Sequence, residues 1–82
     1  MERQLESWYR TAKSAEWTIL EDVRQAYRKA DGVPATGGRV FTVFNMLGNS
    51  FRLITEINYK RQKVYLRHVL THAEYDKGDW KK

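Results

Sequence analysis

Hydrophobic residues near the start of the chain recur every three or four positions, which is the spacing of one face of an α-helix. They are Leu5, Trp8, Tyr9 and Ala12. Most of the nearby positions off this stripe carry charged side chains. The pattern predicts an amphipathic helix that packs against a hydrophobic core through the stripe.

A second helix is expected to begin at Thr18. The threonine hydroxyl can accept hydrogen bonds from the first backbone amides of a helix, and Glu21, three positions later, can complete a capping box. The hydrophobic stripe of this helix would consist of Leu20, Val23, Ala26 and Tyr27. The following segment, 31–38, carries the only proline and three of the five glycines, so a loop is predicted there.

The second half of the chain has the residue pattern of β-strands, because Val, Ile, Phe, Tyr and Thr become frequent. Three strands are expected, over 39–46, 50–58 and 62–70. Gly48-Asn49 would form a two-residue hairpin turn, and 59–62 a looser second turn. The prediction is one α+β domain spanning residues 1–82, with two N-terminal helices packed on a three-stranded antiparallel sheet.

The register of this sheet follows from its hydrophobic positions. Pairing Phe44 with Leu53 across the first turn, and Ile57 with Val64 across the second, gathers most apolar residues on one face. That face is expected to be buried against the helices, and it consists of Val40, Thr42, Phe44, Met46, Phe51, Leu53, Thr55, Ile57, Val64, Leu66, His68 and Leu70. His68 would therefore be a buried structural histidine.

The opposite face combines four cations and one acid with five hydrophobic residues. It consists of Arg39, Phe41, Val43, Asn45, Arg52, Ile54, Glu56, Asn58, Lys63, Tyr65, Arg67 and Val69. Cations and aromatic rings suit the phosphates and bases of a polynucleotide. An ordinary solvated sheet face is the alternative, but its hydrophobic content favours a binding surface. Residues Arg39, Asn45, Lys63 and Tyr65 are predicted to bind RNA there.

Composition limits the classes of partner and site. Fifteen Lys and Arg against ten Asp and Glu give a net charge of +5, which favours nucleic acid or an acidic protein segment as the partner. The absence of cysteine excludes disulfides and thiolate zinc sites. No apolar run approaches the ~18 residues of a membrane span. We therefore expect a cytoplasmic protein with no membrane partner, metal or other cofactor.

A polar segment after the last strand carries the candidate catalytic groups. Thr71 can cap a short C-terminal helical turn, which would place His72, Tyr75 and Asp76 on one side. Histidine exchanges protons near neutral pH, tyrosine offers a hydroxyl, and a carboxylate can hold an imidazole in one tautomer. Taken alone, such a cluster is more often structural than catalytic.

Two ordered motifs in this half resemble the HigB-type toxins. The run Asn45-x-x-Gly48-Asn49-x-x-Arg52-Leu53 is followed at the expected separation by Thr71-His72-x-Glu74-Tyr75-Asp76. Similar residues also occur in the helical part, as Trp8-Tyr9, Ala15-Glu16-Trp17 and Asp22-Val23. The resemblance implies a RelE-like fold and metal-independent cleavage of mRNA, usually on the ribosome. It also implies neutralisation by a helix-turn-helix antitoxin of the HigA-like kind.

The same resemblance places active-site residues at Arg52, Arg67, His72 and Tyr75. Similar toxins usually open with a strand that we expect this chain to lack, and its loss would leave a sheet edge unpaired. RNA can supply its own nucleophile, the 2′-hydroxyl, so the enzyme needs an acid, a base and positive charge. The two arginines are expected to bind phosphate, His72 to transfer a proton, and Tyr75 to stack on a base or relay a proton.

Two other interpretations remain open at this point. One is a non-catalytic toxin or interaction module of the ParE-like kind, which acts by binding a protein target. The other is a truncated, inactive chain. The His-x-x-Tyr-Asp cluster at residues 72–76 favours the nuclease, because a protein that only binds needs no proton donor.

Overall fold

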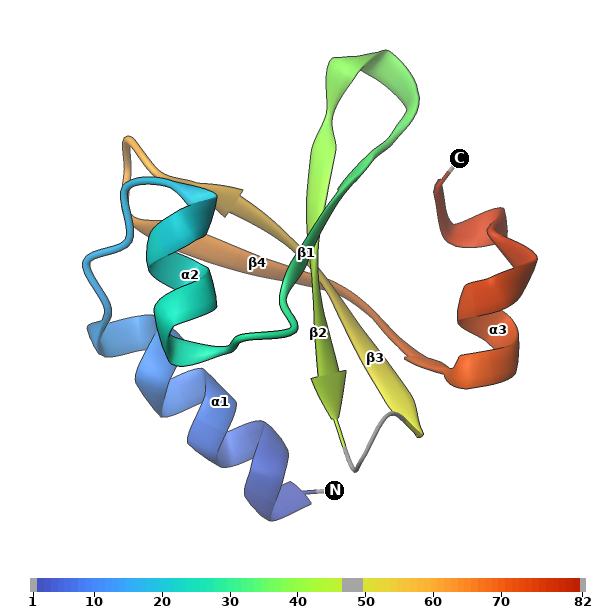
Figure 1. Ribbon diagram of the computed structural model, residues 1–82, viewed down its shortest axis with the longest axis horizontal. Coiled ribbons are helices and arrows are strands. Elements are labelled where there is room, and N and C mark those ends of the chain that lie inside the picture. Colours follow the sequence, from blue (N-terminus) through green and yellow to red (C-terminus); the bar gives the residue numbers. More distant parts are fainter. Residues whose placement is uncertain (1, 47–49, 82) are drawn as a thin grey trace.

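The computed structural model describes residues 2–46 and 50–81, which form an antiparallel sheet with helices on both of its sides (Figure 1). The helices are α1 (Glu2–Ser14), α2 (Leu20–Ala26) and α3 (His72–Lys77), and the strands are β1 (Asp31–Pro34), β2 (Val40–Met46), β3 (Phe51–Asn58) and β4 (Lys63–Thr71). Short 3-10 turns occupy Thr36–Gly38 and Asp79–Lys81. None of the helices in the described ranges is long and apolar enough to cross a membrane.

The predicted α+β class is confirmed, but the predicted number of strands is wrong. The sheet has four strands in the order β1-β2-β3-β4, because the segment expected to be a loop pairs with β2. Val33 lies opposite Phe41 and Pro34 opposite Val40. A proline is compatible with this position because β1 is an edge strand, where an amide on the open side needs no partner. Gly37 and Gly38 then turn the chain at φ 78° and 75°, where glycine is favoured.

The side of the sheet covered by α1 and α2, here called the helix face, carries the larger core. Phe44 is fully buried there, and its ring centroid lies 5.6 Å from that of Trp8, 6.3 Å from that of Trp17 and 5.2 Å from that of Tyr27. Aromatic pairs at such spacings add to the stabilisation from apolar burial. Phe44 is therefore the residue around which the two N-terminal helices pack.

The predicted helical stripes are confirmed only in part. Trp8 and Ala12 are buried in α1, whereas Tyr9 is 59% exposed. In α2, Val23 is buried but Ala26 is exposed.

The predicted capping box at Thr18 is wrong, because the capping carboxylate is that of Asp22 instead of Glu21. The Thr18 backbone N–H and hydroxyl donate to Asp22 Oδ2 at 2.9 and 2.8 Å, and the Ile19 amide donates to the same oxygen at 3.3 Å. These bonds, chiefly those from Thr18, hold the pKa of Asp22 below its usual value. α2 accordingly begins at Leu20, two residues later than predicted.

The predicted register is confirmed between β2 and β3, where Phe44 pairs with Leu53 and Met46 with Phe51. The predicted turn at Gly48-Asn49 lies outside the described residues. Between β3 and β4, Ile57 pairs with Val64 as expected, and the looser turn at 59–62 is present.

A β-bulge changes the register in the second half of β4. Thr55 pairs with Leu66, but the next residue of β3, Ile54, pairs with His68, which leaves Arg67 without a Cα partner. Leu53 consequently pairs with Val69 instead of with His68. The prediction of a buried structural histidine is wrong, because His68 belongs to the other face and is exposed.

Burial on the helix face decreases toward the ends and edge of the sheet. Leu53 is fully buried, as predicted, and Ile57 and Val64 are half-buried. Val40 and Leu66, which were expected in the core, are 54% and 44% exposed. Val40 is the first residue of β2, and Leu66 lies on the terminal strand of the sheet, so both have neighbours on fewer sides.

The opposite side of the sheet, here called the outer face, contains a second and smaller core. Phe41, Val43 and Ile54 are buried there against Trp80, and Leu70 and Tyr75 pack around them. The Trp80 indole N–H donates to the Tyr75 carbonyl at 2.9 Å, which holds the C-terminal turn against α3. The expectation that this whole face is an open binding surface is therefore wrong for the part beneath α3.

Candidate functional site

The uncovered part of the outer face is organised by Glu56. Arg39 donates to this carboxylate from Nε at 3.1 Å and from Nη2 at 2.6 Å, and Arg67 donates from Nε at 3.0 Å. These three residues are here called the Glu56 cluster. The bonds from Arg39, with a smaller contribution from Arg67, hold the pKa of Glu56 below its usual value. The cluster therefore keeps a net charge of +1 with both guanidinium groups fixed in direction.

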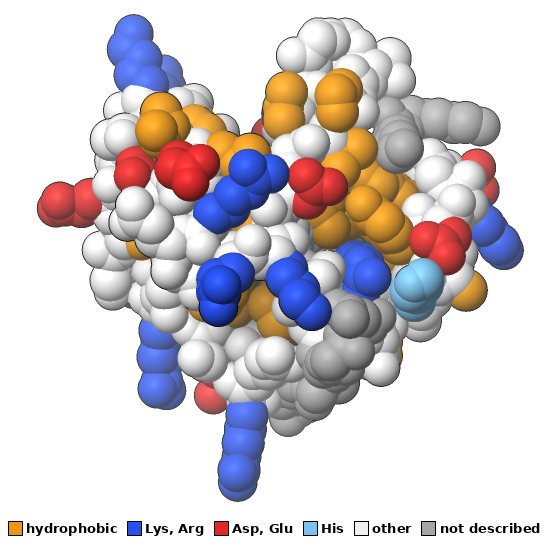
Figure 2. Space-filling model, viewed as in Figure 1, with side chains coloured by type: hydrophobic (Ala, Val, Ile, Leu, Met, Phe, Trp, Pro, Cys, Tyr) orange, Lys and Arg blue, Asp and Glu red, His pale blue; other side chains and the backbone are white. Residues whose placement is uncertain are grey.

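Each of three arginines on this face lies over an aromatic ring. The guanidinium carbon of Arg39 is 5.1 Å from the ring centre of Phe41, that of Arg67 is 5.3 Å from Tyr65, and that of Arg52 is 5.4 Å from Tyr75. Such cation–π contacts orient the planar group and retain its charge. In Figure 2, Lys and Arg side chains gather across the middle of one face beside acidic and hydrophobic ones, with a histidine nearby.

The predicted cap of the C-terminal helix is confirmed. The Thr71 hydroxyl accepts from the Glu74 amide at 3.2 Å, and the Glu74 carboxylate accepts from the Thr71 amide at 2.9 Å. These bonds hold the pKa of Glu74 below its usual value. The amide of His72 donates to the Ser50 carbonyl at 3.1 Å, which joins the first residue of α3 to the chain just before β3.

His72 and Asp76 form the pair predicted from the sequence. His72 Nδ1 lies 3.2 Å from Asp76 Oδ2, and the two side chains are 53% and 62% exposed. A carboxylate at Nδ1 favours the tautomer with a proton there and leaves Nε2 available to a substrate. The imidazole is therefore both oriented and accessible.

Tyr75 lies between a stacked ring and a cation. Its ring is stacked on that of Trp80, with centroids 5.1 Å apart and planes 17° apart, and Arg52 lies over it. Burial raises the pKa of the Tyr75 hydroxyl, and the charge of Asp31 adds to this effect. The phenol thus keeps its proton at neutral pH and can donate a hydrogen bond.

The predicted site residues fall into two groups. Arg52, His72 and Tyr75 lie at the junction of β3 with α3, and Asn45 is the β2 partner of Arg52. Arg39, Tyr65 and Arg67 gather around Glu56, and Lys63 is exposed at the first residue of β4. The β-bulge in β4 helps to assemble the second group. It lies at Arg67, whose guanidinium contacts both Glu56 and the Tyr65 ring.

Three residues of this site were not predicted from the sequence. Glu56 was visible as the single acid among four cations on its face, which is a signal that it pairs with them. Trp80 lies beyond the motifs and gave no signal. His68, expected in the core, instead lines a shallow pocket of ≈ 350 Å³ with Glu74, Lys77 and Trp80.

Within residues 2–46 and 50–81, no three His, Asp or Glu side chains come together as ligands for a metal ion. The metal independence expected from the sequence stays a prediction, since it concerns the reaction.

Comparison with known proteins supplies the family. The model of the family described as HigB_toxin, RelE-like toxic component of a toxin–antitoxin system, matches residues 1–78. The mRNA interferase HigB of Escherichia coli O6:H1 is 32% identical over 73 residues, which are 89% of this chain and 69% of that protein. The mRNA interferase toxin HigB of Escherichia coli K12 is 47% identical over 34 residues, which are 42% of this chain and 33% of that protein.

Proposed function

This chain belongs to the HigB toxin family, the RelE-like toxic components of toxin–antitoxin systems, and we propose that it cleaves messenger RNA. The observation that carries this proposal is the oriented histidine. Nδ1 of His72 is held by Asp76, and α3 also carries Tyr75, which lies under Arg52. A proton-transfer group, a hydroxyl and a fixed cation thus lie around one short helix, as cleavage of a phosphodiester requires.

The proposed reaction uses the RNA as its own nucleophile. The 2′-oxygen attacks the adjacent phosphorus, the bond from phosphorus to the 5′-oxygen breaks, and a cyclic phosphate and a 5′-hydroxyl result. One group takes the proton of the 2′-hydroxyl, and another gives a proton to the departing 5′-oxygen. No metal is required by this scheme.

His72 Nε2 is the proposed proton-transfer atom, since Asp76 occupies the other ring nitrogen. Arg52 stabilises the charge that develops on the phosphoryl oxygens. Tyr75 keeps its hydroxyl proton and serves in base stacking or as a proton relay. Arg67, held toward the outer face by Glu56, binds a phosphate of the same strand.

The rest of the outer face is the proposed path of the RNA. Arg39 and Lys63 would contact backbone phosphates, Asn45 would hydrogen-bond beside Arg52, and the ring of Tyr65 would stack on a base. Tyr65 is 41% exposed and its ring lies beneath the Arg67 guanidinium, so a base could reach the exposed part of an oriented ring.

The cellular location and the partners of the chain are proposed on the same grounds. Residues 1–82 would act as one toxin domain in the cytoplasm, on messages engaged by the ribosome. A helix-turn-helix antitoxin of the HigA-like kind would neutralise it. The family assignment supports an antitoxin partner in general, and the basic surface supports a partner with an acidic segment.

Incubation of the purified chain with a defined message tests the proposal. The message is offered both free, in the presence of a chelator, and on ribosomes, and the cleaved ends are mapped. We expect new 5′-hydroxyl ends in at least one condition. A folded chain that cuts neither form, yet inhibits growth by binding a protein, would replace the proposal with the ParE-like alternative.

A further inference from the structure

A series of aromatic rings connects the two groups of predicted site residues on the outer face. The ring centroids of Phe41 and Trp80 are 6.0 Å apart, and those of Trp80 and Tyr75 are 5.1 Å apart. Arg39 lies over Phe41 at one end of the series, and Arg52 lies over Tyr75 at the other. Trp80 is therefore the middle ring between two arginines that belong to different groups of the site.

The chain just after α3 returns Trp80 to the sheet. α3 ends with Gly78 as its C-cap, and the Gly78 amide donates to the Tyr75 carbonyl at 3.1 Å. The Trp80 indole N–H donates to the same carbonyl at 2.9 Å. A carbonyl oxygen has two lone pairs and can accept both bonds. The end of α3 and the Trp80 side chain are thus tied to one backbone atom of Tyr75.

Trp80 also supports the Tyr75 side chain. The two ring planes are 17° apart, so the pair is stacked, and stacking limits the tilt of both rings. Trp80 is 6% exposed and packs with the buried Phe41, Val43 and Ile54, whereas Tyr75 is only half-buried. The buried ring is therefore the fixed support, and the half-buried ring takes its direction from it.

Arg52 in turn takes its direction from Tyr75. Its guanidinium carbon lies 5.4 Å from the Tyr75 ring centre, and its Nη1 donates to the Phe51 carbonyl at 3.3 Å. A cation–π contact orients the guanidinium over the ring, so a tilt of the ring moves the charge. A misplacement of about 1 Å at a reacting group can lower the rate ~10²-fold.

We propose that Trp80 is a positioning residue for RNA cleavage, because its ring holds Tyr75 in place and Tyr75 holds the guanidinium of Arg52 toward the reacting phosphate. The reaction itself rests on the proposed function. Trp80 is too deeply buried to stack on RNA, so it acts through Tyr75 and not by contact with the substrate. Its loss should lower the cleavage rate and leave RNA affinity nearly unchanged, since the other cations of the outer face remain.

Kinetics of two variants at Trp80 test this proposal. Trp80→Leu keeps much of the apolar cover and removes the stacked ring and the indole N–H. In single-turnover cleavage, the rate constant at saturating protein should fall about tenfold or more, and the half-saturating concentration should change less than about threefold. Trp80→Phe restores a ring and should recover most of the lost rate. Trp80→Met carries the expectations of Trp80→Leu if that variant does not fold.

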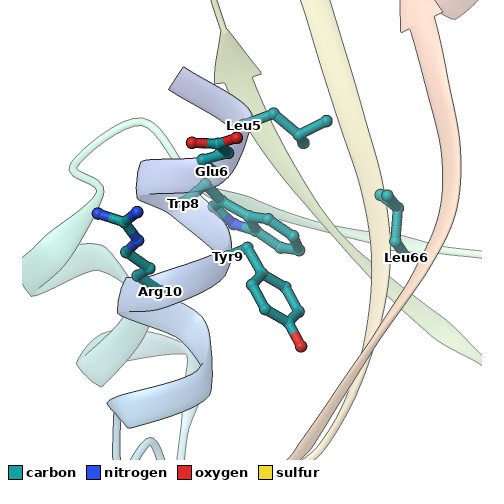
Figure 3. Close-up of a pocket in the computed structure, with 6 residues that line it drawn as sticks. All are labelled: Leu5, Glu6, Trp8, Tyr9, Arg10 and Leu66. Atoms are coloured by element: carbon teal, nitrogen blue, oxygen red, sulfur yellow. The ribbon is translucent and has the colours of Figure 1, made fainter. Parts of the chain in front are cut away.

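Trp8 provides a matched control on the helix face. It is 3% exposed, it packs against Phe44, and Figure 3 shows it on α1 with Leu5 and Tyr9. Trp8→Leu should lower the urea midpoint at least as much as Trp80→Leu does, yet the folded protein should cleave at the parent rate. Lys29→Ala, on an exposed side chain in the turn after α2, is the neutral control.

A double-mutant cycle tests whether Trp80 acts through Tyr75. In the Tyr75→Leu background, Trp80→Leu should lower the rate by less than about a further twofold, because the ring that Trp80 supports is already absent. Multiplied losses in the double variant would mean that the two residues act independently, which would overturn the proposal.

Nuclear magnetic resonance measures the placement of Arg52 without any RNA. The ring current of Tyr75 displaces the proton signals of the Arg52 side chain that lies over it. In Trp80→Leu these signals should move toward the values of an unstacked arginine. In Trp80→Phe and Trp8→Leu they should stay close to those of the parent.

Three further results would overturn the positioning proposal. They are parent-rate cleavage by Trp80→Leu, an equal loss of rate in Trp8→Leu, and Arg52 signals unchanged in Trp80→Leu. A parent chain with displaced Arg52 signals that cleaves no message would refute the proposed function alone. Cleavage by the parent that Trp80→Leu leaves unchanged would refute the positioning role alone.

Discussion

Aromatic rings on the two faces of the sheet have different neighbours. On the helix face, Phe44 packs against other rings, those of Trp8, Trp17 and Tyr27. On the outer face, Phe41, Tyr65 and Tyr75 each lie beneath an arginine, and Phe41 and Tyr75 also contact the ring of Trp80. Rings that contact rings stabilise the fold through buried apolar area, whereas rings beneath arginines hold a charge in one place. The contrast predicts that the core of the helix face contributes most to stability, and that the uncovered part of the outer face contributes mainly to activity.

The largest effect is expected from Phe44→Ala. The side chain is fully buried among three rings, and Phe-to-Ala changes at such sites cost about 3–5 kcal/mol of unfolding free energy. That is a large part of the stability of a small domain, so we expect the variant to be largely unfolded at 37 °C. Urea titration followed by tryptophan fluorescence measures the loss.

Tyr65→Ala is the matched change on the outer face. Tyr65 is 41% exposed, so the expected loss in the same titration is within about 0.5–1 kcal/mol. Similar losses for Tyr65→Ala and Phe44→Ala would show that the two faces do not divide stability and activity in this way.

The second prediction concerns activity alone. His72→Ala should lower the rate of mRNA cleavage by ~10²–10⁴-fold, because it removes the proposed acid–base group. Its side chain is 53% exposed, so the urea midpoint should stay close to that of the parent. Cleavage is measured by single-turnover kinetics, with Lys29→Ala as the control. Parent-like cleavage by His72→Ala would transfer the role to Tyr75 or to a substrate-assisted mechanism.

Strand pairing was predictable from the sequence where the hydrophobic alternation is regular. The alternation of Phe44 and Met46 against Leu53 and Phe51 gave the register of the central hairpin, and the structure has the same pairs. In β4 the same alternation placed His68 among apolar side chains, and this single polar residue in a core row was the available sign of a bulge. The bulge removes the conflict by turning Val69 inward in its place.

Other features depend on tertiary contacts that local patterns do not encode. β1 contains a glycine and a proline, residues that are depleted in strands, so only its pairing with β2 identifies it. Trp80 covers the outer face because the Tyr75 carbonyl accepts its indole N–H. The His72–Asp76 pair, by contrast, followed from helical spacing alone, because residues four apart face each other on a helix.

The third prediction separates the two arginines of the Glu56 cluster. Arg67→Ala should lower both cleavage and RNA affinity, since Arg67 is proposed to bind a phosphate near the reaction. Arg39→Ala should mainly lower affinity. Each lost phosphate contact should reduce the slope of log affinity against log salt by about 0.7–1. Filter binding at several salt concentrations measures this slope, and equal cleavage losses for the two variants would contradict the assignment.

The smallest effect is expected in the pH dependence of stability. Hydrogen bonds from Arg39 and Arg67 hold the pKa of Glu56 below the ordinary glutamate value of 4.5, so the folded chain favours the carboxylate more than the unfolded chain does. The resulting stabilisation is fully present above about pH 4.5 and is lost as the pH falls through the lower folded pKa. Glu56→Gln lacks this contribution at every pH.

The measurement is urea unfolding of the parent and of Glu56→Gln at several values between about pH 6 and pH 3. The parent should lose more stability across this interval than the variant. Asp22 and Glu74, whose pKa values are also lowered, remain in both proteins, so the difference between the two curves isolates Glu56. Parallel curves would mean that the two arginines do not hold the carboxylate in solution, and that the outer face is fixed by its aromatic rings alone.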